Sequence, residues 1–271
     1  MRSLTFALHA AGVLAPGFGS LADLRAACRG GQPPDIAAPL ALPSPEALPA
    51  NERRRASQIV RLTLGCVEQA LKSSPFPVET LRSVFATDEG TGEVCQQMLE
   101  LLATTRQISP LLFSNSVLNA PSGYFSIARR NRQPATVVSV GLESFAGGLA
   151  CAVTEAVTTG QPVLLVSYDA AMTAPMDELL PITEPTATAW ILSAGSQQDT
   201  PALATFDLQF EEATGSAVTP LPTWVPARWA AQSSAHALAA LGLLDADDDA
   251  VYRCTLGGLM LCLRRIEGER A

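Results

Sequence analysis

Ser144, Asp169 and His236 are residues whose types and order along the chain could support covalent chemistry. A serine nucleophile, a carboxylate and a histidine base follow one another in this order in one class of hydrolases. However, the residues around Ser144 do not form the Gly-x-Ser-x-Gly turn of that class, and His236 lies in an alanine-rich stretch that predicts a helix. Ser144 is explained more simply as the N-cap or first turn of a helix. A serine hydrolase is therefore kept as an alternative function.

The segment Thr136–Val140 predicts a strand that turns sharply into a helix at Gly141, because β-branched residues give way to apolar residues at four-residue spacing from Phe145 onward. Enzymes place nucleophiles at such turns, where the positive end of the helix dipole favours a developing negative charge. Here the turn reads Gly141-Leu142-Glu143, and the side chain of Leu142 has no nucleophilic atom. The sequence therefore predicts an elbow that carries no nucleophile.

Composition restricts the possible partners. The chain has 271 residues, 48% of them hydrophobic and 16% charged, with a formal net charge of −8. This acidic balance argues against nucleic acid and anionic membrane surfaces. No window reaches eighteen consecutive apolar residues, so no transmembrane helix is expected.

The cysteines and histidines do not suggest a metal site. Six cysteines occur without Cys-x-x-Cys spacing, and His9 and His236 lack a ligand-like neighbour at helical spacing. The cysteines are interpreted as reduced thiols packed as small hydrophobic residues in a cytoplasmic protein. We expect neither a metal nor a cofactor.

The order of predicted elements indicates an α/β fold with helices on both faces of a mixed, mostly parallel sheet. Strands are expected at 4–14, within 82–90, and at 136–140, 162–169, 189–194, 204–210 and 251–266, the last broken by two glycines; helices are expected at 20–30, 51–74, 91–105, from 144 onward and at 225–244. Residues 172–186 and 194–202 are expected to be loops. We place a first domain at 1–210, with 211–271 as a C-terminal extension packed on it.

Four segments, in order along the chain, resemble the N-terminal half of a β-ketoacyl synthase, in the thiolase-like superfamily. They read HAAGVLAPGFGSLADLRAACRGG at 9–31, ERRRAS at 52–57, SPLLFSNSVLNAPSGYFSIA at 109–128 and QPATVVSVGLESFAGGLACAVTEAVTTGQPVLLVSYDA at 133–170. The resemblance covers roughly residues 1–210. It implies a thiolase-like half-fold in which the C-terminal half of the ketosynthase fold is missing.

The resemblance also implies that this chain lacks condensing activity. Counting from Gln133-Pro134, where the family has Gly-Pro, places Leu142 at the position of the family's acyl-accepting cysteine. Leucine cannot form an acyl-enzyme. The family's two catalytic histidines belong to the missing half, and His9 and His236 match neither of them. The resemblance therefore predicts an inactive homologue without catalytic residues.

Such a pattern is similar to the chain-length factors of type II polyketide and aryl-polyene systems. In that family the inactive subunit pairs with an active ketosynthase, which acts with an acyl carrier protein, and helps to shape its acyl tunnel. Alignment predicts tunnel and interface positions at Leu111, Leu112, Phe113, Ser116, Thr136, Val137, Val138, Ser139 and Val140. A purely structural stabilising subunit is a second alternative, and ordinary core packing would equally explain the apolar residues among these.

Overall fold

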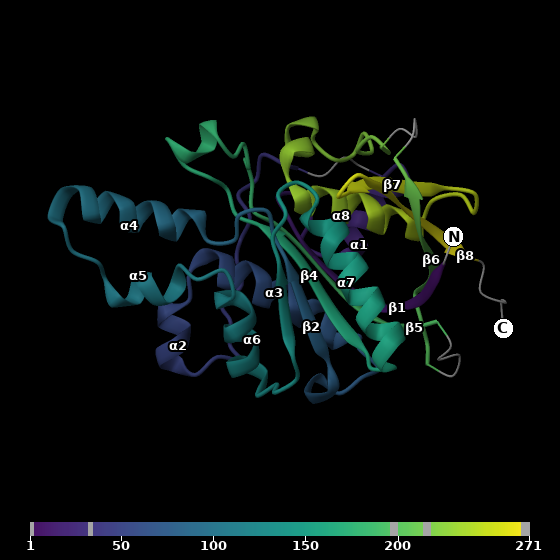
Figure 1. Cartoon of the computed structure of the whole chain (residues 1–271), viewed down its shortest axis with the longest axis horizontal. Helices are drawn as coiled ribbons and strands as arrows, with labels where there is room; N and C mark the ends of the chain where they lie inside the picture. The colour runs from purple at the N-terminus through teal and green to yellow at the C-terminus, as the bar shows by residue number, and fades with distance from the viewer. Residues whose placement is uncertain (1–2, 32–34, 196–199, 214–217, 267–271) are drawn as a thin grey trace.

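One eight-stranded sheet organises the computed structural model, which describes residues 3–31, 35–195, 200–213 and 218–266. The strand order is β3-β2-β4-β5-β1-β6-β8-β7 (Figure 1). The strands are β1 (Leu4–Leu14), β2 (Arg82–Ala86), β3 (Ala135–Val138), β4 (Val163–Asp169), β5 (Thr186–Ala194), β6 (Ala204–Glu212), β7 (Val251–Leu256) and β8 (Leu259–Ile266). The helices are α1 (Leu21–Cys28), α2 (Ala50–Arg55), α3 (Gln58–Lys72), α4 (Gly92–Thr105), α5 (Pro110–Asn115), α6 (Ala120–Arg129), α7 (Ser144–Thr159) and α8 (Ser233–Leu241).

The sheet is mixed, as expected, but the expectation that it is mostly parallel is wrong. Among the described strands β2 alone pairs in parallel, with β3 on one side and β4 on the other, and the remaining pairs are antiparallel. A parallel pair needs a long crossover connection, and the helices α4, α5 and α6 supply one between β2 and its parallel neighbour β3. Between β4 and β5 the described chain contains a loop and one short 3-10 helix, so β5 returns antiparallel beside β4.

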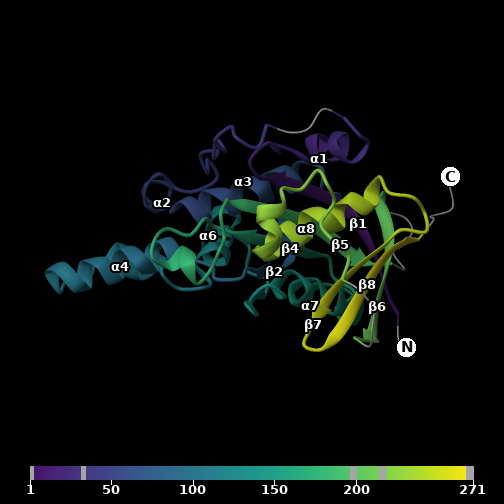
Figure 2. The ribbon, with the colours of Figure 1, turned by 90° about the horizontal axis from the view of Figure 1, so that it is seen from above.

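Helices cover both faces of the sheet, as predicted, and Figure 2 shows the layers from above. On one face α3 and α6 pack against alternate strand residues such as Leu164 and Ile191. On the other face α1, α7 and α8 pack against the opposite set, which includes Leu165 and Trp190. This two-sided burial is why every residue of β4 is buried and why the strand begins with the apolar run Val163–Val166.

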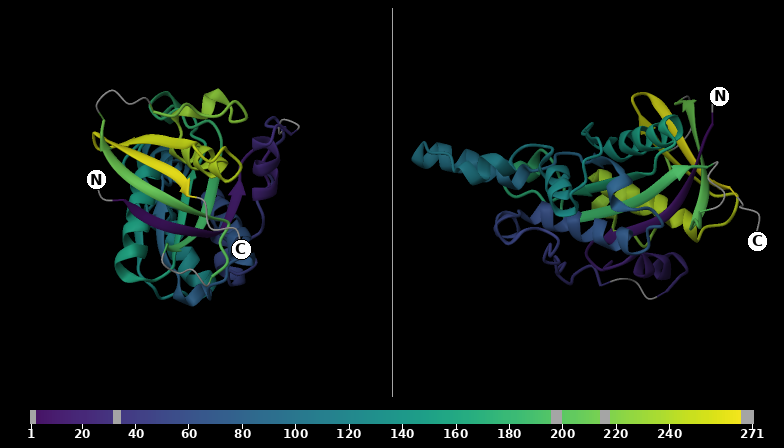
Figure 3. Two further views of the ribbon diagram at one scale, coloured as in Figure 1. Left: turned by 90° about the vertical axis from the view of Figure 1, so that its right-hand side faces the viewer. Right: turned by 90° about the horizontal axis from the view of Figure 1, so that it is seen from below.

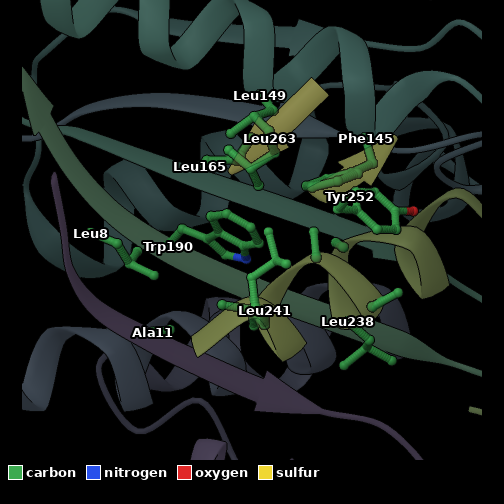
Figure 4. Packing of buried hydrophobic residues seen from close by; sticks show 14 of the residues in the cluster. Leu8, Ala11, Phe145, Leu149, Leu165, Trp190, Leu238, Leu241, Tyr252 and Leu263 are labelled. Atoms are coloured by element: carbon green, nitrogen blue, oxygen red, sulfur yellow. The ribbon is translucent and has the colours of Figure 1, made fainter. Parts of the chain in front are cut away.

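Trp190 lies at the centre of the second core (Figure 4). Its ring centroid is 5.6 Å from that of Phe145 on α7, and its indole N–H donates to Thr188 Oγ1 at 3.0 Å. Leu238 and Leu241 of α8 belong to the same core. The expected long last helix is instead a 3-10 helix at Ala227–Ala231 followed by the shorter α8. Through Trp190, α7 and α8 share one hydrophobic core on the same face of the sheet.

Helix α4 extends away from the rest of the molecule, with α5 beside it, and the β6-β8-β7 end of the sheet lies on the opposite side (Figures 1 and 3). Both helices occur between β2 and β3, so they leave and rejoin the sheet at its β3 end. We call residues 92–118 the arm. None of the described helices has the length and apolarity needed to span a membrane.

Candidate functional site: an elbow without a nucleophile

The elbow after β3 has the expected geometry. Gly141 adopts a φ of +64°, a left-handed conformation that costs glycine little, and α7 begins three residues later at Ser144. Leu142 occupies the turn with 47% of its surface exposed. The sharp strand-to-helix turn therefore presents an exposed apolar side chain where an enzyme of this geometry would present its nucleophile.

Ser144 is part of the turn and is fully buried. Its hydroxyl donates to the Gly141 carbonyl at 2.6 Å and accepts from the Val140 N–H at 2.8 Å. These two bonds close the elbow and occupy the hydroxyl hydrogen. The structural role that the sequence favoured for Ser144 is what the structure shows, although the hydroxyl bridges turn groups and does not cap N2 or N3.

The structure does not assemble the alternative triad. The Asp169 carboxylate accepts the N–H of Asp88 at 2.9 Å and the N–H of Ser234 at 2.7 Å, which joins the ends of β4 and β2 to the start of α8. His236 Nδ1 instead lies 2.7 Å from the hydroxyl of Tyr252. Since Asp169 and Ser144 are bonded to backbone groups and His236 to a phenol, the geometry gives no support to serine hydrolase chemistry.

Burial changes the pKa values of both titratable members of that set. Burial raises the pKa of Asp169 to about 6, with the hydrogen bonds from Ser234 and Asp88 acting in the opposite direction. Burial lowers the pKa of His236, and the Ala230 backbone opposes this only in part. His236 is therefore neutral near pH 7.

A small cavity of about 110 Å³ lies beneath the elbow, lined among others by Leu142, Phe145, His236 and Cys254. Sequence reasoning missed that His236 lines this cavity, because the contact depends on how α8 packs against α7. Burial raises the pKa of the Cys254 thiol to about 12, so it is not a thiolate near neutral pH. The groups named here leave the elbow cavity without an activated nucleophile.

The other cysteines follow the interpretation made from the sequence. All six are free thiols, and Cys66, Cys254 and Cys262 are buried. Burial raises the pKa of Cys151 on α7, which disfavours its thiolate. His9 is hydrogen-bonded to Ser193 and to the Pro201 carbonyl. Within the described residues there is no cluster of three or more His, Cys, Asp or Glu side chains suited to a metal ion.

Strand β3 forms one edge of the sheet and pairs only with β2 in the described part of the chain. The Val138 carbonyl accepts from the Thr87 N–H at 3.1 Å, so Val138 directs its backbone groups toward β2. Because peptide groups alternate along a strand, Val137 directs its N–H and C=O toward the open edge. Thr136, Ser139 and Val140 have exposed side chains there, while Val137 and Val138 are half-buried.

The predicted tunnel residues lie on the arm but do not share one surface. On α5, Leu111 and Phe113 are 43% and 60% exposed. Leu112 and Ser116 are half-buried, because consecutive helical residues point in different directions. The alignment used above did not identify several further exposed apolar residues of the arm and of α6: Leu99, Leu102, Ile108, Val117, Leu118 and Ile127.

The turn between β2 and α4 joins the elbow to the arm. The Ser139 hydroxyl donates to the Asp88 carbonyl at 2.7 Å, and the Thr91 hydroxyl donates to the Ser116 carbonyl at 2.9 Å. The segment Asp88–Thr91 is therefore hydrogen-bonded both to the end of the open strand, next to the elbow, and to the apolar arm. It fixes where the arm lies relative to the elbow.

Comparisons with solved structures agree with the fold described above. A chain in the complex of the ketosynthase ApeO with its chain length factor ApeC from Xenorhabdus doucetiae superposes with a TM-score of 0.72 at 22% identity, covering 97% of this chain and 100% of that one. A chain of the ishigamide ketosynthase/chain length factor gives 0.72 at 15% identity, with the same coverage of both chains. A β-ketoacyl synthase from Burkholderia phymatum gives 0.61 at 14% identity, covering 89% of this chain and 70% of that one.

Sequence comparisons add the family. No curated protein sequence matches the chain significantly. The family described as beta-ketoacyl synthase, N-terminal domain, matches residues 29–240, which include the elbow, the arm and nearly all of α8. This chain, with its leucine-bearing elbow, belongs to the β-ketoacyl synthase N-terminal domain family.

Proposed function

We propose that this chain is a non-catalytic chain-length factor: it pairs with an active β-ketoacyl synthase and shapes the acyl tunnel of that enzyme in aryl-polyene, polyketide or fatty-acid-like biosynthesis. The elbow is the observation that carries the proposal. Its fold is intact, yet its tip is Leu142 and its buried hydroxyl, on Ser144, is bonded within the turn. An intact turn with an unreactive side chain fits a subunit that acts by contacting a partner and not by catalysis.

The partner is inferred from the complexes in which the similar chains occur. Two of these complexes join a ketosynthase to a chain length factor, and a third, AntDE:AntF, joins a ketosynthase to an acyl carrier protein. The matched chains of the first two are covered over their entire length, so the likeness is not confined to one motif. For this chain we infer a heterodimer with a ketosynthase and only indirect contact with the carrier protein.

Two adjoining surfaces support pairing. Val137 directs its backbone N–H and C=O to the open β3 edge, where no strand of the described residues pairs with them, and such groups are satisfied when a partner adds a strand. The arm presents Phe113 with 60% of its surface exposed, together with Leu99 at 59%. Large apolar side chains gathered on one projection are typical of an interaction surface. We therefore assign the β3 edge to docking and Leu111 and Phe113 to the tunnel wall.

Product length tests the tunnel assignment. The chain is co-expressed with its ketosynthase and carrier protein, and products are measured by mass spectrometry. Phe113→Ala removes volume from the proposed wall and is expected to shift the products by at least one two-carbon unit toward greater length. Leu203→Ala removes another exposed apolar side chain, from the β5–β6 connection, and should leave length unchanged. A change of yield without any change of length would favour the purely structural subunit.

A further inference from the structure

A second and larger cavity lies apart from the elbow, among α1, α8, β7 and the segment around Trp224. Its volume is about 270 Å³, and its lining includes Trp224, Ala239, Gly242, Ala250 and Tyr252. It is open to solvent on one side, so a small molecule can enter it without unfolding of the chain. A cavity of 150 Å³ already holds benzene, so this one has room for about two such rings or a short hydrocarbon chain.

Small residues keep this space open. Ala239 and Gly242 lie on the side of α8 and its following turn that faces the cavity, and Ala246 and Ala250 come from the connection to β7. A Cβ atom at Gly242 would lie 3.1 Å from the Trp224 ring. Larger side chains at any of these positions would fill the cavity.

The wall of the cavity offers no free charge among the described residues that line it. Asp245 is its one acidic group, and this carboxylate is paired with Arg25 at 2.8 Å and with Arg29 at 2.7 Å. Burial raises the pKa of the Cys28 thiol to about 11, so this group is uncharged as well near pH 7. The lining therefore favours an uncharged, apolar occupant.

Helix α8 contributes lining residues both to this cavity and to the smaller one beneath the elbow. His236, Ala239 and Leu243 recur at three- and four-residue spacing around α8 and its end, with His236 lining the elbow cavity and the other two lining the larger one. Tyr252 lines the larger cavity and holds His236 Nδ1 at 2.7 Å. The hydrogen-bonded Tyr252–His236 pair thus contributes one residue to the lining of each cavity.

We propose that the cavity between α8 and β7 is a binding site for an uncharged apolar small molecule, a short hydrocarbon chain or one to two fused rings. Nothing in the chain-length-factor assignment requires this site, and it does not depend on that assignment.

Trp224 provides a direct readout, because the other two tryptophans, Trp190 and Trp229, are fully buried. The full chain is titrated with 1-bromohexane, whose bromine quenches indole fluorescence on contact. Saturable quenching at one equivalent is expected, with reversal by 1-hexanol, and Trp224→Phe should abolish it. Quenching that rises linearly without saturation, or that is equal in Trp224→Phe, would overturn the proposal.

Filling the cavity provides the second arm. Ala250→Phe should weaken binding at least tenfold, whereas Ala202→Phe, at an exposed position outside the cavity, should bind as the unmodified chain does. Circular dichroism establishes that both variants fold, and Ala246→Phe replaces Ala250→Phe if the latter does not. Equal affinity in the filled and the control variants would contradict a site in this cavity.

Discussion

The two edges of the sheet are treated very differently by this chain. At the β7 edge, the Thr219 backbone N–H donates to the Arg253 carbonyl at 2.9 Å, and the Thr219 hydroxyl accepts the Arg253 N–H at 2.8 Å. At the β3 edge, Val137 has no strand beside it in the described part of the chain. One edge is covered by the chain itself and the other is left open.

This difference supports the proposal that a partner docks at the β3 edge. Open edges invite pairing, and proteins usually protect them with lysine, proline or a covering segment. The β7 edge has such a segment, whereas the sequence from Thr136 to Val140 contains neither lysine nor proline. The apolar arm is attached at the same end as the open edge, through the Asp88–Thr91 turn. Protection at one end and exposure at the other are consistent with docking at β3.

The largest effect is expected from Val137→Pro. Proline removes the N–H that faces the open edge while leaving the β2 side of the strand intact, as is tolerated in edge strands. Co-purification with the ketosynthase should be lost while the circular dichroism spectrum is retained. Val137→Thr keeps the N–H and the β-branched shape, and should co-purify normally. Full co-purification of Val137→Pro would place the interface elsewhere.

A smaller effect is expected from a charge placed at the same edge. Thr136→Lys puts an ammonium group at an exposed position beside the open backbone groups, where lysine opposes strand pairing. We expect binding to the ketosynthase to weaken about tenfold, equivalent to about 1.4 kcal/mol. Surface plasmon resonance against the immobilised ketosynthase measures this, with Thr158→Lys on exposed α7 surface as the control. Equal affinities for the two lysine variants would count against the β3 edge.

Opening the other edge should affect stability and not pairing. Thr219→Val keeps the shape of the side chain but removes the hydroxyl that bonds to Arg253 and to the Val251 carbonyl. The expected cost is about 1 kcal/mol of unfolding free energy. For a chain of this size, that lowers Tm by about 2–4 °C. Calorimetry measures the shift, and ketosynthase binding should be unchanged. Weaker binding in this variant would remove the distinction between the two edges.

The smallest effect concerns the ion pairs that tie α1 to the turn before β7. Burial acts to raise the pKa of Asp245, but hydrogen bonds from Arg25 and Arg29 outweigh it and hold the pKa below its usual value. Stability from this carboxylate is thus present above about pH 4 and lost as pH falls through its lowered folded-state pKa. Tm should decline more steeply below about pH 4 in the unmodified chain than in Asp245→Asn. Parallel curves would show that these partly exposed pairs contribute little.

Local sequence patterns predicted well where helices begin, including the helix that follows the elbow. Ser20 caps α1 as expected, its side chain accepting the Asp23 N–H, and Gly141 marks the turn into α7. Strand direction was harder, because an apolar run such as β4 looks the same in parallel and antiparallel sheets. Only the loop that follows β4 determines that β5 returns antiparallel.

The candidate site was less predictable, since it depends on distant contacts. The Asp169 carboxylate accepts a hydrogen bond from Ser234, 65 residues further along the chain. Tyr252 of β7 is hydrogen-bonded to His236 of α8. No local spacing contains that information. Alignment predicts which residues line the tunnel, but not on which side of the helix each side chain lies. It therefore places Leu112 with Phe113, although the helix directs these two side chains differently.

Native mass spectrometry of the co-expressed complex after incubation with acyl carrier protein tests the central claim most directly. The account predicts one copy of this chain with one ketosynthase, and an added acyl mass on the ketosynthase chain alone after dissociation. The Leu142→Cys variant should also remain unacylated, because a thiol alone is not expected to restore a condensing site. An acyl mass on the unmodified chain, or its assembly without a ketosynthase, would contradict the account.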